Sequence, residues 1–292
     1  MPERLSPEIE HAAALLEAHP DYRILRSLPP LDLLPLPEPE GRLRTAVVLD
    51  TETTSLDPTT GNIIELALCP MTFDARGRIV AIGSVADWLE DPGHPLPREI
   101  EQLTGLSDAD LAGRVIDDRA ALALLSSADL LIAHNAMFDA AWLERRYPTI
   151  AGKPWCCSLR DIDWRGLGYE ARQLGGLLAE VAGFFNARHR ADADVAALVA
   201  LLAARLSSGR TASSEMILAA SRPTVRVVAN GAPFEVKDRL KGRGYRWDQK
   251  ARGWWKEIAS NVVGDEQDWL LRHAECREPI LREITWHQRH RD

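Results

Sequence analysis

Short apolar runs of strand length, alternating with turns and helical segments, constrain the fold of this chain more than any other feature of its sequence. The run AVVLD, which ends at Asp50, is followed by IIELALC at 63–69 and by an apolar stretch at 79–85, with turn residues between them. This order predicts an antiparallel meander of three strands. A fourth run, LLIAH at 130–134, leads into a helical segment at 138–147, and such alternation is typical of parallel pairing. The sequence therefore predicts an α/β fold with a mixed sheet.

The same patterns divide the chain into four parts. Residues 1–44 contain a short amphipathic helix at 6–18 and a proline-rich connector. The α/β unit covers 45–207 and ends in a helix with apolar residues on one face, after which the chain becomes rich in serine. We interpret 208–222 as a linker. Residues 223–292 follow the order strand, helix, two strands and helix, which predicts a small αβ module.

Composition limits the class of protein to which the chain belongs. A chain of 292 residues, 46% of them hydrophobic, can bury a substantial core. No apolar run approaches the ~18 residues of a membrane span, and the first residues lack the features of a signal peptide, so we expect a soluble cytoplasmic protein without a membrane partner. The formal net charge of -8 argues against a protein that coats nucleic acid, so any nucleic-acid contact must be local.

The four cysteines are expected to be reduced, buried thiols. Cys69, Cys156, Cys157 and Cys276 form no CxxC pair. The adjacent pair has no zinc-ligand spacing. Nothing in the cysteine pattern therefore predicts a zinc site.

Two acids stand at the end of the first predicted strand. Asp50 and Glu52 lie two residues apart, and the two-residue period of a strand points both side chains to the same face. Two like charges at one place are costly unless a cation neutralises them, and carboxylate oxygens favour Mg²⁺ or Mn²⁺ over zinc. Acids at a strand end are more often solvated or capping residues, so this pair alone is weak evidence for a metal site.

A second acid stands where the fourth predicted strand gives way to a helix. In HNAMFD at 134–139, Asp139 lies in the first helical turn. Its charge there could equally stabilise the helix N-terminus. Asn135 could be no more than the N-cap of the same helix.

A third segment, HRADAD at 189–194, combines a histidine with two acids. His189 stands just before a predicted helix, Asp194 lies within its first turns, and Asp192 could be only a cap. A histidine that titrates near neutral pH beside several acids fits a base for water. A lone histidine at such a place is more often a surface or capping residue.

Together these three segments resemble the DEDDh 3′-to-5′ exonucleases, the family that includes the proofreading epsilon subunit of bacterial DNA polymerase III. The resemblance rests on DTETTSLDP (50–58), HNAMFD (134–139) and HRADAD (189–194), which stand in the family's order and at its spacing. The segment LPREIEQLTGLSDADLAG (96–113) is similar to the family's segment after the third strand, so the resemblance covers roughly 45–206. It implies a ribonuclease H-like fold, in which helices flank a mixed sheet.

The resemblance also implies a set of catalytic residues. The acids that would hold two divalent ions, Mg²⁺ or Mn²⁺, are Asp50, Glu52, Asp139 and Asp194. His189 would deprotonate the attacking water. Asp192 would be left out, because the family's last acid follows the histidine by five residues. Ser55 stands where the family often has glycine, which should slightly change the turn without touching a metal ligand.

By the same resemblance, the chain would remove nucleoside 5′-monophosphates from the 3′ end of DNA, with single strands preferred. Residues expected near the terminal nucleotide are Thr53, Leu56, Leu103, Thr104 and Asn135. Leu56 and Leu103 could equally be core residues. An RNA 3′-end-trimming enzyme of the same superfamily and a non-catalytic docking protein are the alternatives. A replication or repair protein is a candidate partner besides the nucleic acid.

The C-terminal module is basic and aromatic in a chain that is acidic overall. Residues 235–256 carry eight Lys or Arg against three Asp or Glu, a difference of +5. Such a mixture of stacking surfaces and cations is typical of single-strand binding. The candidate contacts to nucleic acid are Arg243, Arg246, Trp247, Lys250, Arg252 and Trp254. The alternative is that these tryptophans point inward and form the core of a small module, and a protein-docking role is also open.

Overall fold

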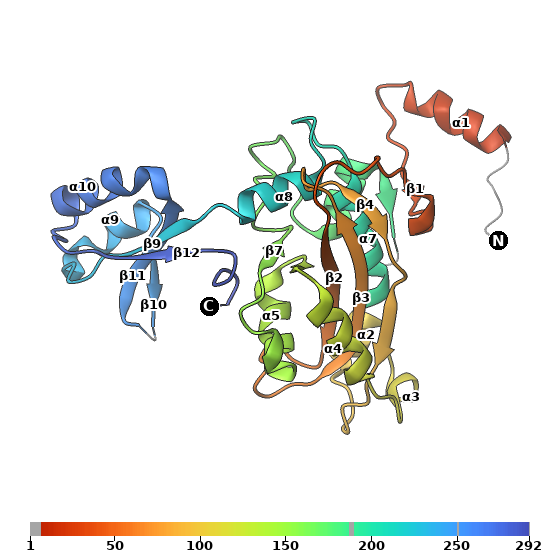
Figure 1. Cartoon of the computed structure of the whole chain (residues 1–292), viewed down its shortest axis with the longest axis horizontal. Coiled ribbons are helices and arrows are strands. Elements are labelled where there is room, and N and C mark those ends of the chain that lie inside the picture. Colours follow the sequence, from red (N-terminus) through yellow and green to blue (C-terminus); the bar gives the residue numbers. More distant parts are fainter. Residues whose placement is uncertain (1–6, 187–189, 250, 292) are drawn as a thin grey trace.

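The computed structural model describes residues 7–186, 190–249 and 251–291, so His189 and Lys250 lie outside the described residues. Two units are visible in Figure 1, a larger α/β unit and a smaller C-terminal module. None of the helices in the described part of the chain has the length and apolar character needed to cross a bilayer.

A mixed sheet forms the centre of the larger unit (Figure 1). Its strands are β2 (Arg44–Thr53), β3 (Ile63–Phe73), β4 (Ile79–Ile82), β5 (Ala86–Leu89), β6 (Leu130–Ala133) and β7 (Trp155–Cys157). They lie in the order β4-β3-β2-β6-β7, with β5 also paired to β3. The pairs that involve β3 are antiparallel, whereas β6 pairs in parallel with both β2 and β7. The predicted meander and mixed sheet are confirmed, except that the stretch 79–85 is a shorter strand followed by the separate strand β5.

Helices flank the sheet on both faces, which confirms the predicted fold class. The helices of this unit are α2 (Arg98–Thr104), α3 (Asp108–Leu111), α4 (Asp118–Ser127), α5 (Ala136–Arg146), α6 (Leu174–Leu177), α7 (Ala191–Ala203) and α8 (Ala212–Ala220). Ala46 and Val48 of β2 are buried in a core shared with α7 and α8, whereas Val47 and Leu49 are buried in a second core shared with α4 and α5. The two-residue period of β2 therefore decides which helix each of its side chains meets.

The N-terminal segment runs along the edge of the larger unit. The predicted helix is present as α1 (Pro7–Glu17), and β1 (Arg26–Ser27) pairs in parallel with β8 (Phe184–Phe185). Leu31 and Leu34 of the proline-rich connector pack against the core that contains α7. Short turns of 3-10 helix at Leu31–Leu33 and Pro148–Ile150 and a π-helical turn at Leu178–Ala182 complete the unit.

The C-terminal module has the order βαββαβ. Its elements are β9 (Thr224–Val228), α9 (Lys237–Gly242), β10 (Arg246–Asp248), β11 (Gly253–Ala259), α10 (Val263–His273) and β12 (Ile280–Ile284), with 3-10 turns at Phe234–Val236 and Ser260–Val262. The sheet order is β10-β11-β9-β12 and all pairs are antiparallel. Sequence reasoning found the first five elements and missed β12. Four of the five residues of that edge strand are exposed, so it carries no alternating pattern.

The segment 208–222, expected to be a linker, contains a helix that belongs to the larger unit. Ala212, Met216 and Ala220 of α8 are buried in the core with α7. Small residues such as Ala and Ser gave this stretch the composition of a linker, yet they allow α8 to pack closely. The described chain therefore passes directly from α8 to β9. All four cysteines are buried and free, as expected.

The last described residues, 285–291, fasten the module to the larger unit. The carbonyl of Trp286 accepts a hydrogen bond from the Trp155 amide of β7 at 3.1 Å, and Arg291 forms an ion pair with Glu144 of α5 at 2.7 Å. Arg289 donates to the carbonyl of Ala220 at 2.7 Å. Figure 1 shows this C-terminal segment between the module and the side of the larger unit that carries α5 and β7.

Arg289 makes the densest set of these contacts. It also donates to the carbonyl of Arg222 at 2.9 Å and to the Thr224 hydroxyl at 3.0 Å, and it forms an ion pair with Glu257 at 3.3 Å. Because one guanidinium bonds α8, β9 and β11 together, we infer that it sets the orientation of the module.

We expect Arg289→Ala to loosen the module from the larger unit. The change removes several charge-assisted hydrogen bonds, and each such bond contributes roughly 1.5–3 kcal/mol to stability. The radius of gyration from small-angle X-ray scattering should increase, and protease cleavage near residue 222 should become faster. Arg282→Ala, which removes an exposed arginine of β12, is the matched control. An unchanged radius and unchanged protection in Arg289→Ala would contradict the assigned role.

Candidate active site

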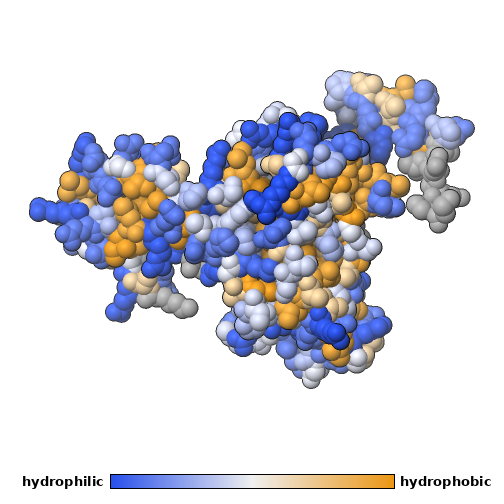
Figure 2. Space-filling model, viewed as in Figure 1, coloured by the Kyte–Doolittle hydropathy of each residue, from blue (hydrophilic) through white to orange (hydrophobic). Residues whose placement is uncertain are grey.

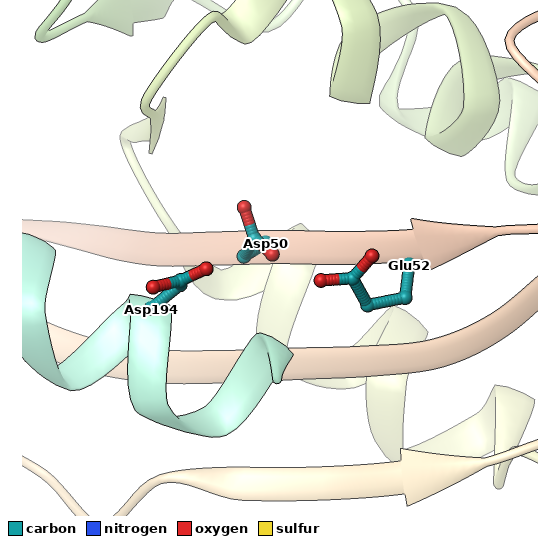
Figure 3. Close-up of side chains that lie close together, drawn as sticks. All are labelled: Asp50, Glu52 and Asp194. Carbon is teal, nitrogen blue, oxygen red and sulfur yellow. The ribbon is translucent and has the colours of Figure 1, made fainter. Parts of the chain in front are cut away.

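The acids Asp50 and Glu52 lie at the carboxyl end of β2 on the face that α7 covers. Ala46 and Val48 point to that face, and side chains alternate along a strand, so positions 50 and 52 follow them. Figure 3 shows both carboxylates beside the first turns of α7. The strand therefore presents two neighbouring carboxylates to the helix that carries the third.

Asp194 completes a cluster of three carboxylates. It is the fourth residue of α7, and its carboxylate stands next to that of Asp50 in Figure 3. One oxygen from each of Asp50, Glu52 and Asp194 lies within 4.8 Å of the others. The side-chain amide of Asn186 donates to Asp194 at 3.3 Å. Asp192 is exposed and accepts a hydrogen bond from the next backbone amide, so it stands apart from the cluster.

Asp139 lies beside this cluster but faces another partner. It is 2% exposed in α5, and its carboxylate accepts a hydrogen bond from the Thr51 hydroxyl at 2.9 Å. Thr51 belongs to the opposite set of β2 side chains, which faces α4 and α5. Asp139 is nevertheless close enough to Asp50 for its charge to raise the pKa of that carboxyl. The structure thus brings together all four acids named from the sequence, three of them within reach of a single cation.

Burial and mutual repulsion make the ionised forms of these acids unfavourable. Burial, then the charges of Asp139, Glu52 and Asp194, hold the pKa of Asp50 well above its usual range. Burial and the charge of Glu65 raise the pKa of Glu52 to about 8, and burial raises the pKa of Asp139 to about 7. A site of this kind needs protons or cations, and hard carboxylate oxygens fit Mg²⁺ or Mn²⁺. The donor set therefore fits the divalent ions that the sequence predicted.

We expect Asp50→Asn to stabilise the protein in EDTA at pH 8. A carboxyl whose pKa is raised on folding makes the folded state less stable as pH rises, because that state must release protons that it binds more tightly than the unfolded chain does. For Glu52 this loss spans about pH 4.5 to 8. Removing the charge at Asp50 should raise the midpoint of thermal unfolding, at about 2–4 °C per kcal/mol.

The matched control is Asp192→Asn, which neutralises an exposed acid of the same helix. Its unfolding midpoint in EDTA should stay close to that of the wild type. Saturating Mg²⁺ should stabilise the wild type and Asp192→Asn more than Asp50→Asn. A midpoint of thermal unfolding below that of the wild type for Asp50→Asn in EDTA would contradict the claim that the neighbouring acids repel Asp50.

Glu65, which sequence reasoning missed, fixes the start of α7. It is fully buried in β3 as the cross-strand neighbour of Glu52. Its carboxylate forms an ion pair with Arg190 at 2.9 Å and accepts a hydrogen bond from the Ala191 amide at 3.1 Å. Because Arg190 is the N-cap of α7, this contact sets where Asp194 meets β2. The signal available in the sequence was the single charge inside the apolar run IIELALC.

We expect Glu65→Gln to weaken metal binding and to destabilise the fold. An amide keeps the size of the side chain but loses the charge-assisted contact with Arg190, at roughly 1.5–3 kcal/mol. Outer-shell changes of this kind typically reduce metal affinity by roughly 10- to 100-fold. Calorimetric titration with Mn²⁺ and thermal unfolding measure the two effects. Glu99→Gln, at an exposed acid of α2, is the control, and equal Mn²⁺ affinity in both variants would contradict the role of Glu65.

The residues expected near the terminal nucleotide occupy different environments. Leu56 is 87% exposed and Leu103 is 49% exposed, so the core alternative is wrong for both. Thr53 and Thr104 are buried. The Thr53 hydroxyl donates to the carbonyl of Ser55 at 2.7 Å, and the Thr104 hydroxyl donates to the carbonyl of Ile100 at 2.9 Å. The exposed leucines are therefore the members of this set with apolar surface open to a ligand.

The HNAMFD segment is held by its histidine. His134 is bonded through Nε2 to the carbonyl of Arg172 at 3.0 Å and through Nδ1 to the Ser158 hydroxyl at 2.8 Å. Burial lowers the pKa of His134 to about 4, so the ring is neutral at neutral pH. Asn135 is at the N-cap position of α5 with φ 83°, and its side chain makes no capping hydrogen bond. Asn135 thus occupies the N-cap position that the alternative assigned to it, but without the side-chain hydrogen bond of a cap.

The tail residues named from the sequence divide into inward and outward groups. Trp254 packs against the module's core, as the alternative supposed, and Arg243 forms an ion pair with Glu266 at 3.1 Å. Arg246, Trp247 and Arg252 are exposed, whereas Lys250 lies outside the described residues. Arg243 is exposed despite its ion pair, so among the described tail residues only Trp254 is turned toward the core.

Comparison with known proteins gives three findings. Residues 47–202, more than half of the chain, match the model of a family described as Exonuclease. The DNA polymerases III PolC-type of Streptococcus pyogenes serotypes M5 and M1 are 34% identical over 105 residues, which are 35% of this chain and 7% of each relative. The chain therefore spans a small part of the length of these relatives.

Two solved structures are also similar. The first is Exonuclease X in complex with 5′ overhanging duplex DNA, with a TM-score of 0.41, 21% identity, and coverage of 60% of this chain and 99% of that chain. The second is Exonuclease I of E. coli in complex with a dA16 oligonucleotide, with a TM-score of 0.49, 14% identity, and coverage of 78% and 67%.

Proposed function

The chain belongs to the DEDDh 3′-to-5′ exonuclease family, and from this premise we propose that it hydrolyses DNA from the 3′ end, with single strands preferred. The products are nucleoside 5′-monophosphates. The observation that carries the proposal is the cluster of Asp50, Glu52 and Asp194, which lies inside the segment matched by the family model. The PolC-type relatives, named as DNA polymerases, support DNA as the substrate and a task in replication or repair.

We assign Asp50, Glu52, Asp139 and Asp194 as the residues that hold two divalent ions, Mg²⁺ or Mn²⁺. The repulsion among these partly or fully buried carboxylates supports the assignment, because cations would relieve it. Asp139 is included because its buried carboxylate already acts on Asp50. When bound, such ions neutralise the charge that develops on the attacking and leaving oxygens of an in-line displacement.

His189 is assigned as the general base. It accepts a proton from the attacking water while the water oxygen forms a bond to phosphorus and the bond from phosphorus to the 3′ oxygen breaks. The leaving oxygen then takes a proton from solvent. The support is the spacing of five residues between His189 and Asp194 and a side chain that ordinarily titrates near neutral pH.

The exposed leucines are assigned to the terminal nucleotide. Leu56 and Leu103 offer apolar surface on which a base can rest. Thr53, Thr104 and Asn135 complete the proposed contacts, with the buried threonines shaping the backbone around them. None of these five side chains is assigned a contact with a 2′-hydroxyl, the group that distinguishes RNA from DNA.

The decisive measurement is gel-resolved digestion of 5′-labelled single-stranded DNA and RNA in Mg²⁺ or Mn²⁺. The wild type should produce a ladder that shortens from the 3′ end, faster on DNA. Asp50→Ala and His189→Ala should each reduce the rate by roughly a thousandfold, because several kcal/mol of transition-state stabilisation disappear at ~1.4 kcal/mol per decade.

Asp192→Ala is the matched control, since it removes an acid of the same motif that stands apart from the cluster. Its rate should stay close to that of the wild type. Faster digestion of RNA than DNA would favour the RNA-trimming alternative. The absence of product from the wild type on both polymers would overturn the enzyme proposal and leave a docking role for the chain.

A further inference from the structure

A cleft with a volume of about 980 Å³ lies between the two units. Its walls include Met137, Arg160 and Arg172 of the larger unit. The module contributes Arg226, Arg246 and Trp255. Figure 2 shows the two units as separate bodies that meet at a narrow junction. The exonuclease assignment of the larger unit gives no role to this cleft.

The module's wall is the face of its sheet that carries no helix. Val227 of β9 and Ile258 of β11 point to the other face, where they share a core with α9 and α10. Because side chains alternate along a strand, Arg226 and Trp255 point to the helix-free face. Arg246 of β10 pairs with Trp255 in register and therefore shares this face. Two planar groups and a further cation thus stand together on an open sheet.

The planar groups form a ready stacking surface. The guanidinium carbon of Arg226 lies over the Trp255 ring, 4.3 Å from its centre, which is a cation-π contact. Nucleic-acid bases stack on aromatic rings and on arginine planes alike. Bases are free to stack in this way only where a strand is unpaired. The sheet face therefore favours a single strand over a duplex.

The cleft offers cations for phosphates. Arg160, Arg172 and Arg246 are exposed and form no ion pair with any residue in the described ranges. Arg172 is held in place, since it donates to the carbonyl of Leu159 at 3.3 Å and its own carbonyl is bonded to His134. Guanidinium groups in a groove are the usual partners of a single-strand backbone.

The acids that line the cleft are already engaged within the protein. Asp161 lies 3.1 Å from the His290 ring, and Glu257 forms an ion pair with Arg289 at 3.3 Å. Asp248 accepts a hydrogen bond from a backbone amide of its own turn at 2.9 Å. The lining of the cleft holds five arginines and one lysine against these three acids, so its formal charge is positive, although the whole chain has a formal charge of -8.

The cleft adjoins the candidate active site through α5. Met137 lines the cleft from the first turn of this helix, and Asp139 follows two residues later beside Asp50. Arg172 is bonded to His134 of the same segment. Residues two apart on a helix point to different sides of it, so the N-terminal turn of α5 stands between the acidic cluster and the cleft, and a strand that passes this turn would reach both.

We infer that the cleft holds the single-stranded nucleic acid that precedes the terminal nucleotide. The phosphates lie against Arg160, Arg172 and Arg246, and a base stacks on the pair of Arg226 and Trp255. This inference rests on the proposed exonuclease function, because it places the same strand in the cleft and at the acidic cluster. The module thereby makes long single strands better substrates than short ones.

The test measures the binding of labelled oligothymidylates to the full chain by fluorescence anisotropy. EDTA is present so that no hydrolysis occurs. Lengths of about 4 and about 16 nucleotides span the range over which single-strand sites extend. The wild type should bind the longer strand more tightly. In Arg160→Ala/Arg246→Ala this preference for length should fall by about tenfold or more, and the slope of log affinity against log salt should shrink by about 1.4.

Arg272→Ala is the matched control. Arg272 is exposed on α10, outside the cleft, and forms an ion pair with Asp268 of the same helix. Its loss removes one positive charge from the module, as the Arg246→Ala change does, and should leave the preference for length unchanged. Thermal unfolding of all variants verifies that each is folded.

Three outcomes would overturn the inference. The wild type could bind both lengths equally, the double variant could behave like Arg272→Ala, or polyglutamate could compete as well as the longer strand, which would assign the cleft to an acidic protein. Digestion in Mg²⁺ is read separately. Normal digestion without a preference for length in binding would contradict the inference about the cleft but not the exonuclease proposal. Tight, length-dependent binding without digestion would contradict the exonuclease proposal but not single-strand binding in the cleft.

Discussion

The carboxylates at the end of β2 repel one another, and this repulsion must be balanced by the packing around them. One oxygen from each of the half-buried Asp50, Glu52 and Asp194 lies within 4.8 Å of the others, and the buried Asp139 adds a fourth carboxylate beside them. Such a cluster opposes folding when it is ionised, so the surrounding structure must hold it together. Packing on both faces of the sheet provides this, because the same strand that carries the acids is buried in two cores.

The positions of the helices follow from this need. α7 brings Asp194 to one face of β2, and the buried contact of Glu65 with Arg190 fixes where that helix begins. α5 brings Asp139 to the other side, where Thr51 holds it. Each acid outside β2 is therefore placed by a hydrogen bond or ion pair at or near the N-terminal end of its helix. Positive helix ends also moderate the concentrated negative charge.

The distribution of charge reconciles an acidic chain with a polyanionic substrate. The net charge of -8 repels nucleic acid over most of the surface, so attraction must come from local sites. Divalent ions would reverse the sign at the acidic cluster, and the arginines of the cleft would do so between the two units. The C-terminal segment, through Arg289 and Arg291, holds the module against the larger unit, with the cleft between them.

The mixed sheet and the acids of the three motifs could be predicted from the sequence, because strand and helix periods and motif spacing are local properties. The sequence did not reveal Glu65 as the anchor of α7, since a partner 125 residues away in the chain is found only after folding. The sequence pattern also did not predict β12, and the segment that forms α8 was interpreted as a linker. Only the tertiary structure decided which tryptophan faces inward: Trp254 enters the core and Trp255 the cleft, because the register of β11 against β9 sets the face of each side chain.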